Sequence, residues 1–232
     1  MCMISTRQSL KDAYSKIWHD SKTSIESNKA GKDAAPEEGG SRWGVSLIFR
    51  PDRKTSQALA NACEAMRQYV GSESIVYTPA NFHTTVMSIG YFRADYSNDE
   101  TFPLILSAVN ESLKNVSEFS HEICGLTAST TAVLAQGFPA GDTLSRIREL
   151  LTNEMLKTGL NWPEKTKART FSHVSLAVFG GPLTDGRGLF QYIEKNRSRD
   201  YGVSTIPQLE MVTYQKNFNT VNMITREIIE LQ

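Results

Sequence analysis

Two short apolar segments of this chain each carry a histidine two residues before a hydroxyl side chain. They are FHTTVMSI at residues 82–89 and FSHVSLAV at residues 171–178. Successive side chains on a β-strand point to opposite faces, so a residue and its second neighbour share one face. His83 is therefore expected beside Thr85, and His173 beside Ser175. The two segments predict strands of a sheet that bury one face and present imidazole and hydroxyl groups on the other.

A third histidine also precedes a hydroxyl, at His19-Asp20-Ser21, but in a different setting. Apolar residues recur at helical spacing around it. On a helix, positions two apart point about 200° away from each other, so His19 and Ser21 cannot act together. We therefore expect His19 on the surface of a helix. The residues that set this helical spacing are Leu10, Ala13, Tyr14, Ile17 and Trp18.

Two histidines and two hydroxyls are suited to acid–base chemistry at a phosphate. An imidazole has an ordinary pKa of about 6.5, so one can remove a proton from water while a second, protonated one donates to the leaving oxygen. The attacking and leaving oxygens lie on opposite sides of phosphorus, so the base and the acid must flank it. We predict His83 and His173 as this pair. Thr85 and Ser175 are predicted to donate hydrogen bonds to the non-bridging oxygens.

The two triplets, 90 residues apart, resemble those of the two-histidine (2H) phosphoesterase superfamily, which includes RNA ligase-like cyclic phosphodiesterases. The run RWGVSLIF at residues 42–49 is similar, more weakly, to the first strand of that family. The likeness covers residues 41–232 in layout, and what precedes them does not fit the minimal family pattern. The resemblance implies an α+β fold: a bilobal single domain with two pseudo-symmetric antiparallel-sheet lobes, outer helices and a central cleft between the lobes.

The same resemblance implies a phosphodiesterase that hydrolyses a 2′,3′-cyclic nucleotide phosphate or a short oligonucleotide phosphodiester without a cofactor. Two alternatives stay open: a nucleotide- or RNA-end-binding module without turnover, and an RNA-end 3′ exonuclease or ligase of the same superfamily. The triplets do not say which histidine is the acid. No Asp, Glu or Cys near either histidine completes a zinc ligand set, so we expect no metal. The candidate substrate-binding residues are Tyr214, Lys216 and Arg42.

Periodicity and turn signals predict the remaining elements. Helices are expected at 6–25, over about 15 residues after Asp52, from about 101 to 113, from a cap at Asp142 or Thr143 to Gly159, and at 187–195. Strands are expected at 45–49, 75–77, 82–89, 122–127, 131–136, 169–179, 209–214 and 221–231. We divide the chain into an N-terminal helical appendage (1–26), a flexible linker (27–41) and a phosphoesterase-like domain (42–232). Two interpretations of the basic run with Lys165, Lys167 and Arg169 stay open: a solvated loop, which we expect, and a local basic rim beside His173.

Composition limits the partners and the location of the protein. Lys and Arg together number 25, as do Asp and Glu, which gives a formal net charge of zero. No global positive field therefore attracts long nucleic acid, and a small nucleotide or short RNA is the expected substrate. Three scattered cysteines do not form a disulfide framework. No signal peptide or membrane-spanning run is apparent, so we expect a cytoplasmic protein that does not bind membranes, and favour a monomer.

Overall fold

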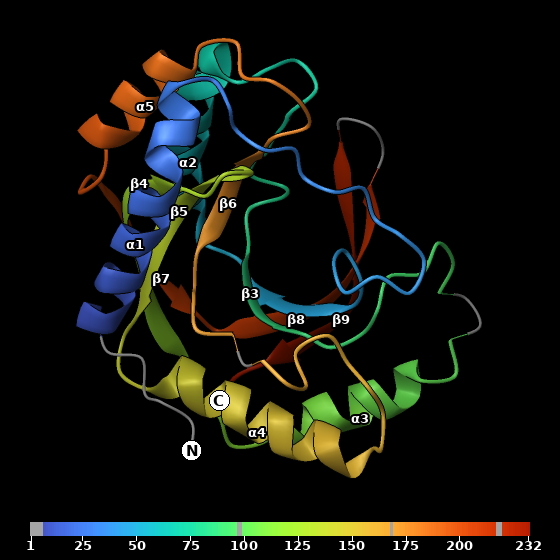
Figure 1. The fold of residues 1–232 in the computed structure, drawn as a ribbon. Helices are drawn as coiled ribbons and strands as arrows, with labels where there is room; N and C mark the ends of the chain where they lie inside the picture. Colours follow the sequence, from blue (N-terminus) through green and yellow to red (C-terminus); the bar gives the residue numbers. More distant parts are fainter. Residues whose placement is uncertain (1–6, 97–98, 168, 217–219) are drawn as a thin grey trace.

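The computed structural model describes residues 7–96, 99–167, 169–216 and 220–232. Within them, one nine-stranded sheet runs through the molecule in the order β7-β4-β5-β6-β3-β1-β8-β9, with β2 paired to β6. Every pairing is antiparallel, and the sheet curls into a half-barrel (Figure 1). The strands are β1 (Ser46–Phe49), β2 (Ile75–Val76), β3 (Thr84–Ser88), β4 (Phe119–Ala128), β5 (Ala132–Pro139), β6 (Val174–Val178), β7 (Asp200–Ile206), β8 (Gln208–Lys216) and β9 (Val221–Glu230).

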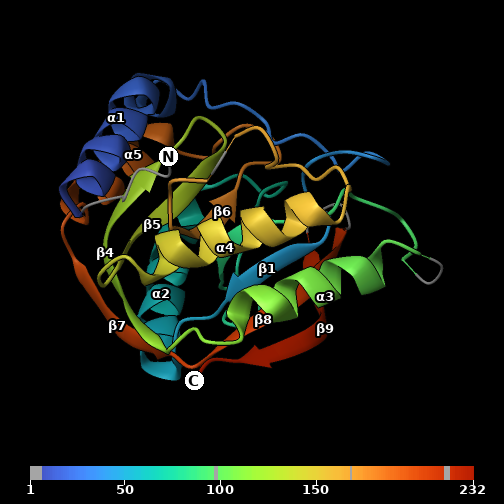
Figure 2. The same ribbon diagram turned by 90° about the horizontal axis from the view of Figure 1, so that it is seen from below.

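The helices cover the outside of the curled sheet in two groups (Figures 1 and 2). One group packs on β4 to β7 and shares a core with them, while the other packs beneath β1, β3 and β8 and encloses a second core. The α+β class predicted from the sequence is confirmed. The first group is α1 (Arg7–Glu26), α2 (Arg53–Met66) and α5 (Gly186–Lys195), and the second is α3 (Phe102–Leu113) and α4 (Thr143–Lys157).

The two halves of the sheet do not correspond to the two halves of the chain. We expected a strand, helix, strand unit from the first half and a repeat of it from the second. Instead, β2 pairs with β6, α2 packs against β6 and β7, and β1 lies between β3 and β8. The halves also belong to one sheet, because β3 pairs with β6 at Thr84 and Val174. Elements from the first and second halves of the chain therefore alternate within one sheet, and the pairing of β3 with β6 connects its two parts.

Most predicted elements are present, although several of their bounds differ. The two histidine-bearing strands are shorter than expected, and each begins at the residue after its histidine. Strand β7 was not predicted, because Gly202 and the exposed Val203 interrupt its apolar alternation. Asp142 stands at the N-cap of α4, but its side chain makes no capping hydrogen bond among the described residues.

The N-terminal helix α1 is packed into the molecule. Leu10, Tyr14, Trp18 and Ile25 are at most 4% exposed, so one whole stripe of the helix is buried. The segment 27–41 then forms hydrogen bonds with loops at the ends of the strands. The Gly31 N–H donates to the backbone oxygen of Thr130 at 2.7 Å, and the Asp33 N–H to that of Phe179 at 2.8 Å. The division of the chain into appendage, linker and domain stays a prediction.

A buried arginine ties α4 to both histidine-bearing segments. Arg148 is 6% exposed, and its guanidinium donates to the backbone oxygens of Val86 (2.9 Å), Thr85 (3.3 Å) and Phe171 (2.7 Å). A buried charge is tolerated only where its hydrogen-bonding capacity is used, and three carbonyl oxygens meet that need here. Arg148 therefore connects the start of β3 to the approach to β6.

Arg148→Met should lower the free energy of unfolding by about 3 kcal/mol, because it leaves three buried carbonyl oxygens without their donors. The exposed Arg146, on the opposite face of the same helix, provides the control: Arg146→Met should change stability by less than about 0.5 kcal/mol. Urea denaturation of both variants measures the difference. Equal stability in the two variants would show that the three hydrogen bonds of Arg148 do not stabilise the fold.

Candidate functional site

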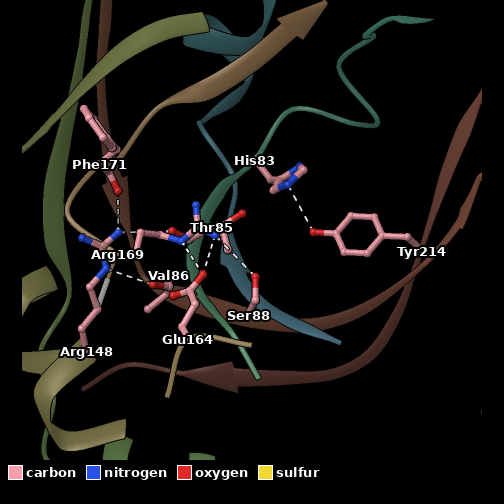
Figure 3. Close-up of polar contacts among 9 residues, drawn as sticks. All are labelled: His83, Thr85, Val86, Ser88, Arg148, Glu164, Arg169, Phe171 and Tyr214. Atoms are coloured by element: carbon pink, nitrogen blue, oxygen red, sulfur yellow. Dashed lines mark hydrogen bonds and ion pairs between the residues drawn. The ribbon is translucent and has the colours of Figure 1, made fainter. Parts of the chain in front are cut away.

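A cavity of about 320 Å³ is lined by residues of β1, β3, β6 and β8 and of the neighbouring loops. Figure 3 shows part of this lining, including His83, Thr85, Arg169 and Tyr214. All four residues of the two triplets line the cavity. Their neighbours are a mixture of aromatic rings, arginines and small hydroxyl residues. The complete lining is Ser41, Arg42, Trp43, Ser46, Tyr77, His83, Thr85, Ser88, Pro163, Glu164, Arg169, His173, Ser175, Val178 and Tyr214.

The pairing of β3 with β6 brings the triplets together. Thr84 lies opposite Val174, and both are fully buried. In an antiparallel pair, the residue before one partner lies near the residue after the other. This register places His83 near Ser175 and Thr85 near His173, all on the face opposite the buried pair. The histidine and the hydroxyl of each triplet thus lie on one face, as expected, and the two triplets lie on the same face of the sheet.

The same irregularity occurs in both strands. In the β1–β3 register Val86 is an extra residue, and in the β5–β6 register Leu176 is one. Each stands three positions after its histidine. A bulge re-aims the side chains that follow it, and the next cavity-lining residues are Ser88 and Val178, each five positions after its histidine. The two halves of the site therefore repeat each other beyond the triplets, which the sequence did not reveal.

The His83 imidazole is held in one orientation. Its Nδ1 lies 2.8 Å from the Asn81 backbone oxygen, which can only accept, so Nδ1 carries the proton. The other nitrogen, Nε2, then presents a lone pair and lies 3.3 Å from the Tyr214 hydroxyl. Burial raises the pKa of Tyr214 to about 12, so this hydroxyl is protonated at neutral pH and can donate to Nε2. His83 is arranged as a proton acceptor.

The His173 imidazole is held differently. Its Nδ1 is buried and has no hydrogen-bond partner in the described part of the chain. Its ring lies 6.4 Å from that of Phe171, in an edge arrangement. No bond equivalent to that between His83 and Asn81 fixes its tautomer, so the two imidazoles are not equivalent.

Burial and positive charge keep both imidazoles neutral. Burial lowers the pKa of His83 to about 4, against the opposing bond to Asn81, and the charges of Arg50 and Arg169 lower it as well. For His173, burial lowers the pKa to about 3, and the charge of Arg169 is the next contribution. A cavity with neutral imidazoles and a nearby arginine favours an anionic ligand, because an anion would offset both effects.

Arg169 corrects one prediction. We expected it to be part of a solvated loop with Lys165 and Lys167, and both lysines are indeed exposed. The Arg169 side chain, however, is only 26% exposed, and its Nε and Nη2 donate to Glu164 Oε1 at 3.0 and 2.5 Å. Its Nη2 also lies 3.4 Å from Ser88 Oγ (Figure 3). The alternation of charge and polarity in the loop does not say which of the three cations turns inward.

The predicted substrate-binding residues have different outcomes. Tyr214 lies in the cavity, beside His83. Arg42 lies at its edge with a 56% exposed side chain, where it forms an ion pair with the buried Asp33 and stacks over Trp43. Lys216 is the last residue of β8, and its side chain is outside the described part of the structure. The contacts of Tyr214, Arg42 and Lys216 with a substrate stay predictions.

Two functional residues were not predicted: Trp43, which lines the cavity, and Arg148, which donates hydrogen bonds to the backbone of Thr85 and Phe171. Trp43 has a φ of +66°, a left-handed conformation that is rare for a large side chain, and its ring meets Tyr214 edge to face at 5.7 Å. The sequence gives no sign of this conformation, because the left-handed position itself is occupied by neither Gly nor Asn. Arg148 did leave a signal, because it falls on the apolar stripe of α4 with Leu144, Leu151 and Met155.

No family model and no curated protein matches the sequence. Solved structures do match. TT0787 of Thermus thermophilus aligns with a TM-score of 0.61 at 14% identity, over 81% of this chain and 97% of its own. E. coli LigT complexed with 3′-AMP aligns with a TM-score of 0.56 at 8% identity, over 82% and 98%. ATU0111 of Agrobacterium tumefaciens, a protein of unknown function, aligns with a TM-score of 0.55 at 12% identity, over 87% and 96%.

These matches extend over nearly the whole of each solved structure. One further match, at a TM-score of 0.55 and 8% identity, is a phosphoesterase. Among the described residues, no helix is long and apolar enough to cross a membrane. No three His, Cys, Asp or Glu side chains in those ranges come together as a metal site. At these identities the likeness concerns the fold, and the chain has the LigT-like α+β fold that the two triplets predicted.

Proposed function

We propose that this protein is a metal-independent phosphodiesterase that opens a 2′,3′-cyclic nucleotide phosphate or a short oligonucleotide phosphodiester. The observation that carries the proposal is the meeting of both His-x-hydroxyl triplets in one cavity, with His83 Nε2 arranged as a proton acceptor. Base and acid on adjacent strands can flank a phosphate placed between them. An RNA-end 3′ exonuclease of the same superfamily would use the same groups on a different substrate, and a ligase would use them to form a phosphodiester in the reverse direction.

In the proposed reaction, His83 Nε2 removes a proton from water and the water oxygen attacks phosphorus. The bond from phosphorus to the leaving ribose oxygen breaks, and that oxygen takes a proton from His173. Thr85 and Ser175 donate hydrogen bonds to the non-bridging oxygens as negative charge grows there. Arg169 adds positive charge near both imidazoles. The fixed tautomer of His83 supports its assignment as the base, which leaves the acid role to His173.

The size and lining of the cavity support a nucleotide-sized substrate. A volume of about 320 Å³ is at the lower end of the range for small-molecule sites. Trp43, Tyr77 and Tyr214 provide aromatic surface beside the polar groups, and aromatic rings stack on bases of any identity. Crystal structures of LigT hold 3′-AMP, ATP and NADP+, so a protein of this fold binds nucleotides.

Turnover in the presence of EDTA on 2′,3′-cyclic nucleotides, ADP-ribose cyclic phosphate, 2′,5′-oligoadenylate and short RNA tests the proposal. His83→Ala and His173→Ala should each lose about 10²- to 10⁴-fold in kcat, because each removes one proton-transfer group. Thr85→Val and Ser175→Ala should lose about 10²-fold through loss of a hydrogen-bond donor.

His19→Ala is the matched control, because His19 belongs to the third triplet and is exposed on α1. It should leave kcat unchanged. Nucleotide binding without turnover on any substrate would instead indicate a binding module, and full activity in either cavity histidine variant would exclude the acid–base pair.

The pH dependence should separate the free and the bound enzyme. The reaction needs neutral His83, whose pKa is about 4 in the free protein, together with protonated His173, so kcat/KM should fall as the pH rises above about 4, because the pKa of His173 is only about 3. A bound phosphate raises that pKa, so the decline of kcat should lie at higher pH, by roughly one unit or more. Both apparent values belong to the coupled pair of imidazoles. Steady-state rates from pH 4 to 9 provide the test, and coincident profiles would contradict it.

A further inference from the structure

His173 lies just outside the hydrogen-bonded ladder of the sheet. The β5–β6 register ends at the pair Ala135 and Val174, and β6 begins at Val174. The backbone of 171–173 is therefore held by other groups. The carbonyl of Phe171 accepts from Arg148, and the carbonyl of Ser172 accepts from Nε2 of the buried His121 at 3.1 Å.

A third group of this backbone, the Ser172 N–H, is held from the N-terminal helix. The N–H of Ser172, the residue before His173, donates to the Tyr14 hydroxyl of α1 at 3.3 Å. The same hydroxyl accepts from the Gly137 N–H at 3.2 Å and lies 3.3 Å from the Gly137 carbonyl, to which it can donate. The Ser172 hydroxyl donates to that carbonyl as well, at 3.0 Å. One phenol thus joins the approach to His173 to strand β5.

Tyr14 has little freedom to move. Its side chain is fully buried, and its ring packs at 5.7 Å from Phe138 and at 5.4 Å from Phe171. A buried hydroxyl with three backbone contacts is costly to displace, because each group would be left without a partner. The position of the hydroxyl and that of the Ser172 peptide are therefore coupled.

We infer that Tyr14 is a positioning residue for His173: its hydroxyl fixes the peptide before the histidine and so directs the imidazole into the cavity. This inference rests on the catalytic role proposed for His173. It gives the helix 7–26 a part in catalysis, although Tyr14 does not line the cavity. Misplacement of a catalytic group by a fraction of an ångström reduces the rate without abolishing binding.

The test compares Tyr14→Phe with Trp18→Phe. Tyr14→Phe removes only the hydroxyl, whereas Trp18→Phe removes the indole bond to Glu194 of α5 from the same buried stripe of the same helix. Tyr14→Phe should lower kcat on the order of tenfold with little change in KM, and it should shift the imidazole NMR resonances of His173. Trp18→Phe should leave both unchanged. Equal effects of the two variants, or unchanged kcat and resonances in Tyr14→Phe, would overturn the inference.

Two further readouts keep the outcomes separate. The Ser172 amide of the wild-type protein should exchange its hydrogen only on global unfolding, and fast exchange would overturn the inference even if Tyr14→Phe does not fold. The NMR and exchange measurements do not require turnover. If the wild-type protein proves inactive while Tyr14→Phe still shifts the His173 resonances, the structural coupling stands and the proposed function fails.

Discussion

The site depends on one strand pairing in the sheet, in which Thr84 of β3 lies opposite Val174 of β6. Both residues are fully buried, so the core fixes which face of each strand is turned inward. The alternate residues of the two strands then have to share the opposite face. A one-residue slip of either strand would turn its imidazole from the cavity into the apolar core and an apolar side chain into the cavity, which makes this register strongly favoured. The matching bulges at Val86 and Leu176 then direct the next cavity-lining side chains, Ser88 and Val178.

The buried position of the two imidazoles determines their pKa values. The same packing that aligns them removes them from water, and Arg169 lies close enough to lower the pKa of both. Its charge is partly balanced by Glu164, whose carboxylate accepts two of its hydrogen bonds. The cavity therefore holds neutral bases beside a cation. Such a site is completed by an anion, whose charge allows one imidazole to take up the proton that an acid needs.

The sequence predicted those features that depend on local patterns, and missed those that depend on distant partners. Alternation predicted the two histidine strands, and helical spacing predicted α1 and the exposure of His19. Strand β7 was missed because Gly202 and Val203 break its pattern, although β4 pairs along its whole length. The inward turn of Arg169 depends on Glu164 and Ser88. The role of Arg148 depends on carbonyls of β3 and of the segment before β6, both remote in the sequence. No local pattern records such contacts.

The titration of the imidazoles of His83 and His173 by NMR, with and without a bound 2′- or 3′-nucleotide, tests the central claim most directly. In the free protein, both imidazoles should stay neutral down to about pH 5, because burial lowers both pKa values. With the nucleotide bound, one of them should take up a proton at a pH that is higher by roughly one unit or more. Two imidazoles that titrate near pH 6.5 in the free protein and do not respond to the nucleotide would contradict a desolvated acid–base pair built to receive a phosphate.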